Sequence, residues 1–159
     1  MVITPEELQR VKDQAEELYK KIGEVSCPYF KEVVAFNTKG LDHIKFKDWN
    51  KTRLIEDQYR RLKLLYLAPV IIHASHTLQE FREQSHFERQ KINSRWENRM
   101  VRVNYFGFVA IVDEVRVKIV VKQIKGGNKF FWSIYPHWKT KMVNGAPKKI
   151  LHDGDMETQ

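Results

Sequence analysis

Residues Met100–Tyr135 have the sequence MVRVNYFGFVAIVDEVRVKIVVKQIKGGNKFFWSIY, and this stretch decides the fold. β-Branched and aromatic residues fill three runs, which polar residues at 113–114 and 125–128 separate. Runs of this length bounded by turn residues are typical of strands. The second break contains two glycines, which reach a positive φ without steric cost. The stretch therefore predicts two consecutive β-hairpins.

The two turns also predict a register for these strands. The expected pairs are Phe106 with Val121, Phe108 with Ile119, Lys118 with Tyr135, Val120 with Ser133, and Lys122 with Phe131. Side chains alternate between the faces of a strand, so every residue is assigned to one face. One face is apolar and predicts a core: Phe106, Phe108, Ala110, Val117, Ile119, Val121, Trp132 and Ile134.

The opposite face mixes cations, aromatic rings and a hydroxyl group. It carries Tyr105, Arg116, Lys118, Lys122, Phe131, Ser133 and Tyr135. Lysine and arginine attract phosphate, and flat rings offer surfaces on which bases stack. The alternative is an ordinary solvated basic face.

Composition indicates one globular domain. The chain has 159 residues, of which 42% are hydrophobic and 30% charged. No apolar run approaches the roughly 20 residues of a membrane helix, and the first residues, MVITPEELQR, lack the order of a secretory signal. Cys27 is the only cysteine, which excludes an internal disulfide and a cysteine metal cluster. We expect a cytoplasmic protein that needs no membrane.

The net charge is +8, and most of the excess lies in one region. Residues 101–141 contain eight basic and two acidic side chains. A basic patch confined to one element indicates a polyanionic partner.

The remainder of the chain predicts an α+β fold, with N-terminal helices packed on a twisted antiparallel sheet of about four strands. Thr4-Pro5-Glu6-Glu7 is a helix start with a capping box, and Gly23 ends that helix. Residues 37–47 suggest a loop that runs into a short element. A second helix is expected over residues 50–68, ended by Pro69. Residues 1–141 would form the domain, and residues 142–159 a polar, flexible tail.

The histidines offer a candidate general acid or base. His43 lies among Lys39, Lys45 and Lys47, whose charges favour its neutral, proton-accepting form. The alternative is a surface histidine without a chemical role. His73 and His76 have a spacing compatible with a metal, but no third ligand accompanies them, so we expect no metal and no cofactor.

Three segments together resemble a known nuclease family. They are GLDHIKFK at residues 40–47, RLIEDQYRRLKLLYLAP at 53–69 and VKIVVKQIKGGNKFFWSIYPHW at 117–138. Over residues 37–141 the chain resembles the phage- and mobile-element-associated branch of the barnase, EndoU, colicin and RelE-like (BECR) nucleases. The resemblance implies a BECR-like fold and an endoribonuclease, often the toxin of a toxin–antitoxin system, that cleaves RNA without a metal.

In that chemistry the ribose 2′-hydroxyl attacks the adjacent phosphate and leaves a 2′,3′-cyclic phosphate. It needs a base, an acid for the departing oxygen, and cations for the charge on phosphorus. The resemblance implies His43 as general acid or base, Arg53 and Lys122 as phosphate ligands and Ser133 as an orienting hydroxyl. Further phosphate contacts would be Arg60, Arg116 and Lys118, with Tyr105, Phe131 and Tyr135 as stacking surfaces. His137 is the alternative imidazole.

Two other functions use the same face. A non-catalytic RNA- or DNA-binding module would bind with strong salt dependence and no turnover. An adaptor would instead dock an acidic protein, and an acidic antitoxin or immunity protein would also suit an enzyme with this charge. The chain lacks GxxxxGK[ST] and GxSxG, so P-loop and α/β-hydrolase chemistry are not indicated.

Overall fold

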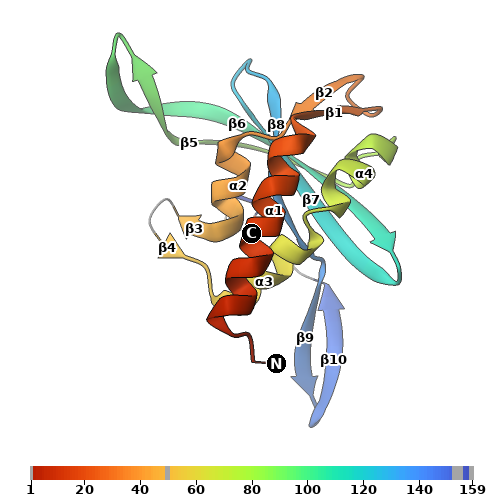
Figure 1. The fold of residues 1–159 in the computed structure, drawn as a ribbon. Helices are drawn as coiled ribbons and strands as arrows, with labels where there is room; N and C mark the ends of the chain where they lie inside the picture. Colours follow the sequence, from red (N-terminus) through yellow and green to blue (C-terminus); the bar gives the residue numbers. More distant parts are fainter. Residues whose placement is uncertain (1, 49–50, 152–155, 158–159) are drawn as a thin grey trace.

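The computed structural model describes residues 2–48, 51–151 and 156–157. They form an α+β fold with four helices, α1 (Pro5–Ile22), α2 (Thr38–Lys45), α3 (Ile55–Leu64) and α4 (Leu67–Ala74) (Figure 1). The strands are β1 (Glu24–Cys27), β2 (Glu32–Ala35), β3 (Phe46–Asp48), β4 (Lys51–Thr52), β5 (Glu80–Ile92), β6 (Arg95–Val112), β7 (Val115–Ile124), β8 (Lys129–Pro136), β9 (Trp138–Val143) and β10 (Ala146–Leu151). None of the helices in the described part of the chain has the length and apolar content needed to cross a bilayer.

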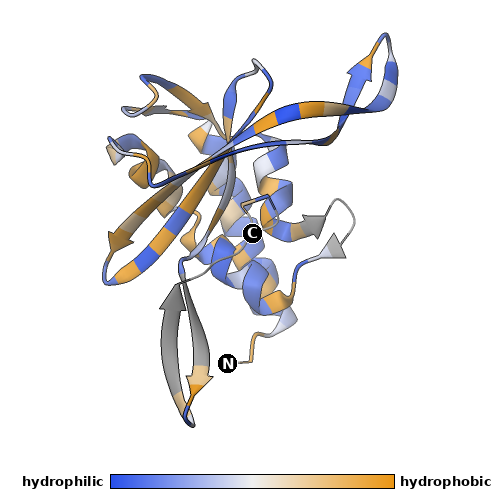
Figure 2. Ribbon diagram, turned by 180° about the vertical axis from the view of Figure 1, so that it is seen from behind, coloured by the Kyte–Doolittle hydropathy of each residue, from blue (hydrophilic) through white to orange (hydrophobic). Residues whose placement is uncertain are grey.

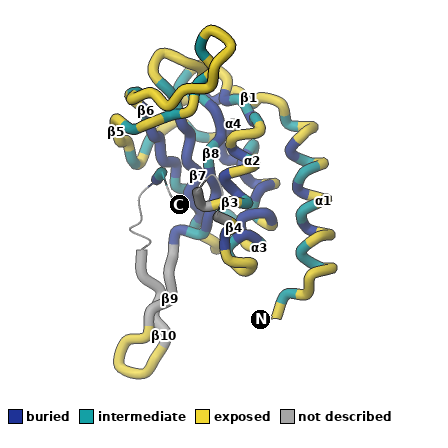
Figure 3. Tube along the Cα trace, turned by 90° about the vertical axis from the view of Figure 1, so that its left-hand side faces the viewer, coloured by how far each residue is buried: buried dark blue, intermediate teal, exposed yellow. Residues whose placement is uncertain are grey.

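The N-terminal helix is as the sequence predicts. The Glu7 N–H donates to the Thr4 side chain at 3.1 Å, and Gly23 follows the helix with φ of 64°. Val11, Ala15 and Tyr19 recur at helical spacing and are buried. The helix packs along α3 and closes one side of the molecule, away from the β5–β6 hairpin (Figure 3).

The main sheet is larger than the sequence predicts. Its strand order is β1-β2-β8-β7-β6-β5, six strands rather than about four. It is also mixed, because β2 runs parallel to β8 and meets it at the pair Ala35–Phe130. A parallel pair needs a long connection, and here α2 to α4 and β5 to β7 lie between the two strands. Two small hairpins, β3–β4 and β9–β10, stand outside this sheet.

The register of β6, β7 and β8 follows the prediction except at one point. Val120 pairs with Ser133 as expected, but Lys122 pairs with Phe130 instead of Phe131. A β-bulge between Val120 and Val121 inserts one extra residue of β8 into the ladder. Because side chains alternate along a strand, the bulge moves Phe131 to the helix-covered face of the sheet.

The two faces of the sheet belong to two separate apolar clusters. The larger cluster joins the helices to the sheet, and its sheet residues include Phe106, Phe108, Val117, Ile119, Val121, Phe131 and Ile134. The smaller cluster lies on the other face and consists of Val103, Tyr105, Val120, Tyr135 and Met156, with Trp132 packed against it. Figure 2 shows apolar and polar residues alternating along these strands. The face expected to be an open basic surface is therefore largely covered.

Two predicted elements differ in the structure. Residues 37–47 were expected to be a loop that runs into a short element; residues 38–45 form the helix α2, and the Asn37 side chain accepts a hydrogen bond from the Gly40 N–H at 3.3 Å. The helix expected over residues 50–68 is two helices, α3 and α4; residue 50 lies outside the described part. Pro69 does not end a helix but lies in the first turn of α4, where backbone N–H groups have no intrahelical partner.

The C-terminal region is more structured than a polar tail. The expected boundary at residue 141 falls inside β9, and β10 pairs with β9 from Ala146 to Leu151. Met156 is fully buried in the smaller cluster. Residues 152–155 and 158–159, which the prediction of a tail also covers, lie outside the described residues.

Candidate functional site

A cleft of about 870 Å³ lies between α2 and the strands β5 to β8. Its wall includes His43, Phe87, Arg89, Trp96, Lys122 and Trp132. This volume lies within the range of small-molecule and cofactor sites. The wall also carries Lys39 and three carboxylates, Asp42, Glu88 and Glu157, so cations and anions are equal in number among the described residues that line it. Its flat rings and cations are groups that contact bases and phosphates, and its carboxylates compete for the same cations.

Gly40 lets α2 lie directly on β8. A Cβ atom at this position would overlap the carbonyl oxygen of Phe131 and would lie 2.8 Å from the Tyr19 hydroxyl oxygen. A glycine is therefore required for this close approach. One turn further along α2, His43 reaches Trp132 of β8.

His43 is held by two neighbours. Its ring stacks on that of Trp132, with 4.0 Å between the centroids and 18° between the planes. The Arg53 Nη2 atom lies 3.0 Å from Nε2 of His43, and Arg53 Nε donates to the His43 carbonyl at 2.8 Å. A guanidinium can only donate, so Nε2 accepts and the proton of the neutral imidazole is on Nδ1.

A chain of polar contacts, buried except at Asp57, continues from Arg53 to Ser133. Asp57 accepts from Arg53 Nη1 at 3.3 Å and from Arg61 Nε at 2.9 Å. Arg61 Nη1 then donates to the Ser133 hydroxyl at 2.7 Å, and its guanidinium lies 5.1 Å from the centre of the Tyr135 ring. Burial lowers the pKa of Arg61, and the charge of Asp57 opposes this shift. Ser133 therefore supports Arg61 within the fold.

Lys122 approaches the cleft from β7. Its Nζ atom lies 3.9 Å from the centre of the Trp132 ring, 2.7 Å from Glu88 Oε1 and 3.5 Å from Glu157 Oε2. Burial lowers the pKa of Lys122, while Glu88 acts in the opposite direction. For Glu88, burial alone would raise the pKa, but Lys122 and a hydrogen bond from His86 outweigh it and hold the pKa below its ordinary value.

The structure brings three of the four predicted catalytic residues together. His43 and Lys122 both line the cleft and both contact the Trp132 ring, and Arg53 contacts His43. Ser133 is fully buried and joins them through Asp57 and Arg61.

The predicted binding residues are more dispersed. Lys118 is buried and forms an ion pair with Glu80. Tyr105 and Tyr135 are also buried, so neither ring is an open stacking surface. Arg116 is half-buried near the start of β7, where its carbonyl accepts from the His137 N–H at 2.8 Å.

The predicted positions of two binding residues, Phe131 and Arg60, are wrong. Phe131 is not a stacking surface for bases, because its ring stacks on Phe36 in the core at 5.0 Å. Trp132 takes its place at the cleft as a consequence of the bulge. Arg60 is exposed and is not among the described residues that line the cleft, whereas its neighbour Arg61 is buried.

Sequence reasoning missed Glu88, Trp96 and the central position of Asp57. The i, i+4 spacing of Arg53, Asp57 and Arg61 is visible in the sequence and indicates a network on one helix face. No comparable signal marks Glu88, because EFREQSHFERQKI, residues 80–92, has apolar residues only at positions 81, 87 and 92 and therefore lacks the alternation typical of a strand.

His137 lies in a different environment from His43. Burial, followed by the charges of Lys118 and Arg116, lowers the pKa of its imidazole. It is not among the described residues that line the cleft. The geometry therefore favours His43 as the imidazole of this site.

One group of side chains has the composition of a metal site. Ligand atoms of His86, Glu88 and Glu157 lie within 4.8 Å of one another. The ammonium of Lys122 already contacts both carboxylates and balances their charge. His73 and His76, the pair considered from the sequence, are exposed.

No family model, no curated protein and no solved structure matches this chain.

Proposed function

We propose that the chain is a metal-independent endoribonuclease whose active site is the cleft. The observation that carries the proposal is the arrangement around Trp132, where His43 and Lys122 meet one ring at 4.0 and 3.9 Å. An imidazole and an ammonium within one cleft supply the proton acceptor and the cation that attack by a 2′-hydroxyl requires.

The polar contacts of the cleft suggest a role for each group. An incoming phosphodiester would pair with Lys122. Arg53 is buried and is not among the described residues that line the cleft, so it would have to move away from the Nε2 atom of His43 before it reached the phosphate. Nε2 would then accept the proton of the 2′-hydroxyl as its oxygen attacks phosphorus. The P–O5′ bond breaks, and the 5′-oxygen takes a proton from Lys122, whose lowered pKa suits this transfer.

In the structure, carboxylates stand where the phosphate would bind. Glu88 and Glu157 both contact the Lys122 ammonium. A phosphate group must therefore compete with two carboxylates, and RNA should bind more tightly when their charge is reduced.

The test is cleavage of mixed cellular RNA by purified protein in excess EDTA. We expect fragments with 2′,3′-cyclic phosphate ends and a loss of about 100-fold or more in His43→Gln. The matched variant at the lysine is Lys122→Met with Glu88→Gln, which removes both charges of the pair. The control is Lys129→Met, because Lys129 also pairs with a carboxylate and lies 4.8 Å from an aromatic ring centre, outside the cleft.

Two results would contradict the proposal. One is wild-type protein that leaves RNA intact at every concentration tested. The other is cleavage that persists unchanged in His43→Gln and in the Lys122 variant, which would assign the activity to a contaminant or another site. Thermal unfolding of each variant shows whether a loss of activity reflects a loss of fold.

A second candidate is a non-catalytic RNA-binding module. The specific observation in its favour is that His43 Nε2 contacts Arg53 and the Lys122 ammonium contacts Glu88. Both groups are thus occupied by protein partners and would not need to take part in a reaction. It predicts salt-dependent binding of RNA with no fragments. The net charge of +8 also suits an acidic inhibitor protein, as expected for a toxin that acts in the cytoplasm.

A further inference from the structure

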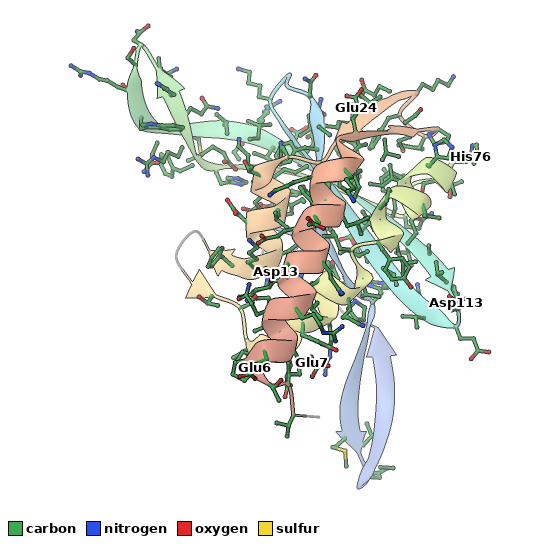
Figure 4. All side chains as sticks on the ribbon, viewed as in Figure 1. Glu6, Glu7, Asp13, Glu24, His76 and Asp113 are labelled. Carbon is green, nitrogen blue, oxygen red and sulfur yellow. The ribbon has the colours of Figure 1, made fainter. Side chains whose placement is uncertain are left out.

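The outer part of the β5–β6 hairpin projects from the sheet. Residues 85–102, here called the arm, have strand partners only within the arm, because β7 pairs with β6 from Val103 onward. The side chain of Glu88 reaches Lys122 of β7, and the Arg102 carbonyl accepts from the Lys125 N–H at 2.9 Å. A two-residue turn at Asn93 and Ser94, both with positive φ, closes the arm. Figures 1 and 4 show the arm extending away from the helices, with side chains along its length.

One face of the arm is aromatic and basic. Pairing across the two strands places the following side chains on it: Ser85, Phe87, Arg89, Lys91, Trp96, Asn98, Met100 and Arg102. Within residues 85–102, all of which the structure describes, this face carries no acidic side chain; Glu88 and Glu97 alternate to the other face. Within the arm the charge of this face is therefore positive throughout. Beyond its base, Glu83 lies on the same face and pairs with Arg102 at 3.6 Å.

The large apolar side chains of this face are exposed. Phe87 is 67% exposed, Trp96 60% and Met100 58%. Arg89 lies over the Trp96 ring at 5.3 Å, so a cation and an exposed ring lie together on this face. Exposed apolar side chains gathered in one place indicate a binding surface rather than a core.

The face continues into the cleft. Phe87, Arg89, Trp96 and Asn98 belong to the arm and also line the cleft. Between Trp96 and Met100 the strand rises by about 13 Å, so the surface is elongated rather than a single pocket.

We propose that this face of the arm binds single-stranded RNA and leads the strand into the cleft. Bases stack on Trp96 and Phe87, and phosphates pair with Arg89 and Lys91, whereas Arg102 already pairs with Glu83 at 3.6 Å. Only an unpaired strand exposes its base faces to such rings, and a uniformly basic surface suits a polyanion. The identification of this RNA as a substrate rests on the proposed function; its binding does not.

The test is fluorescence anisotropy with a labelled 20-nucleotide 2′-O-methyl RNA. This RNA lacks the 2′-hydroxyl, so binding is measured without cleavage. We expect Trp96→Ala to weaken binding about 5- to 100-fold and Trp96→Phe to restore most of it. Arg89→Gln with Lys91→Gln should also lower the salt dependence of the affinity.

The control is Arg99→Gln, which removes a cation from the opposite face of the same arm. We expect an effect below about twofold, since Arg99 already pairs with Glu97 at 3.7 Å. Equal binding by Trp96→Ala and wild type would overturn the proposal. Equal affinity for a 2′-O-methyl duplex would also overturn it, because the arm would then not select unpaired bases. Self-association that light scattering detects and Phe87→Ser abolishes would overturn it too, because the face would then bind a second copy of the protein.

These outcomes are separable from those of the proposed function. If wild-type protein binds the 2′-O-methyl RNA through Trp96 but leaves unmodified RNA intact, the proposed endoribonuclease activity is refuted and RNA binding by the arm is supported. If the protein cleaves RNA in EDTA but Trp96→Ala binds RNA as tightly as wild type, the endoribonuclease activity is supported and RNA binding by the arm is refuted.

Discussion

Asp57 joins the two arginines of the site, and its substitution tests how strongly that network supports the fold. Asp57→Asn keeps the shape of the side chain but removes its charge. It leaves two guanidinium groups, on Arg53 and Arg61, each with a side chain only 3% exposed, facing a neutral amide. The fold must then hold two buried cations whose shared counterion is gone.

The expected loss follows from that burial. Removing one partner of a buried ion pair costs about 3–5 kcal/mol. The Asp57 side chain is 40% exposed, so solvent screens part of the interaction and we expect about 2–3 kcal/mol. With a urea m-value of about 2 kcal/mol per molar, the unfolding midpoint falls by roughly 1–1.5 M. Far-UV circular dichroism during urea titration measures it.

Glu56→Gln is the matched control. Glu56 precedes Asp57 in the first turn of α3 and is exposed, so the variant loses the same favourable charge near the helix N-terminus. A midpoint for Asp57→Asn within about 0.2 M of this control would refute the reasoning, because the buried arginines would then not depend on Asp57.

Three further outcomes are expected. Gly40→Ala should destabilise the protein by about 2 kcal/mol or more, seen as a lower thermal midpoint, because the new methyl group overlaps the Phe131 carbonyl; an unchanged midpoint would contradict the close approach of α2. The pKa of Glu88 is depressed in the folded protein, so its pairing with Lys122 stabilises the fold above the ordinary carboxylate pKa and is lost as pH falls through the lower folded value. Urea titrations should therefore show Glu88→Gln less stable than wild type at pH 7, with the difference vanishing in strong acid; a constant difference would argue against the ion pair. Glu157→Gln should raise the affinity for 2′-O-methyl RNA by up to about fivefold, because it frees Lys122 from one carboxylate; weaker binding would argue against competition.

Patterns within short stretches of sequence correctly predicted helix α1 and the strands β6, β7 and β8. The cap at Thr4 and the apolar spacing of α1 are properties of consecutive residues, and so are the strands β6, β7 and β8. The bulge could not be predicted, because Phe131 and Trp132 are both large and aromatic and either suits a core. The sequence therefore assigned each of them to the wrong face.

The sequence predicted that His43, Arg53 and Lys122 belong to one site, but it did not predict which carboxylates pair with them. His43, Arg53 and Lys122 come together because α2, the segment before α3 and β7 meet at β8, which no local pattern specifies. The sheet face looked open because its cations alternate with aromatic residues. Its cations are paired because Glu88 and Glu157, distant in the sequence, both reach Lys122, and Glu80 reaches Lys118.

The contact of α2 with β8 has a consequence for aggregation. Among the described residues, β2 meets β8 only at Phe130, so beyond that residue one edge of β8 has no strand beside it. Helices α2 and α3 cover this edge, and Gly40 brings α2 close enough to do so. Uncovered strand edges pair with strands of other molecules. Helix α2, which carries His43, thus also prevents this edge from pairing with another molecule. Variants that weaken the packing of α2 on β8 should therefore be less soluble and should also lose the position of His43 in the cleft.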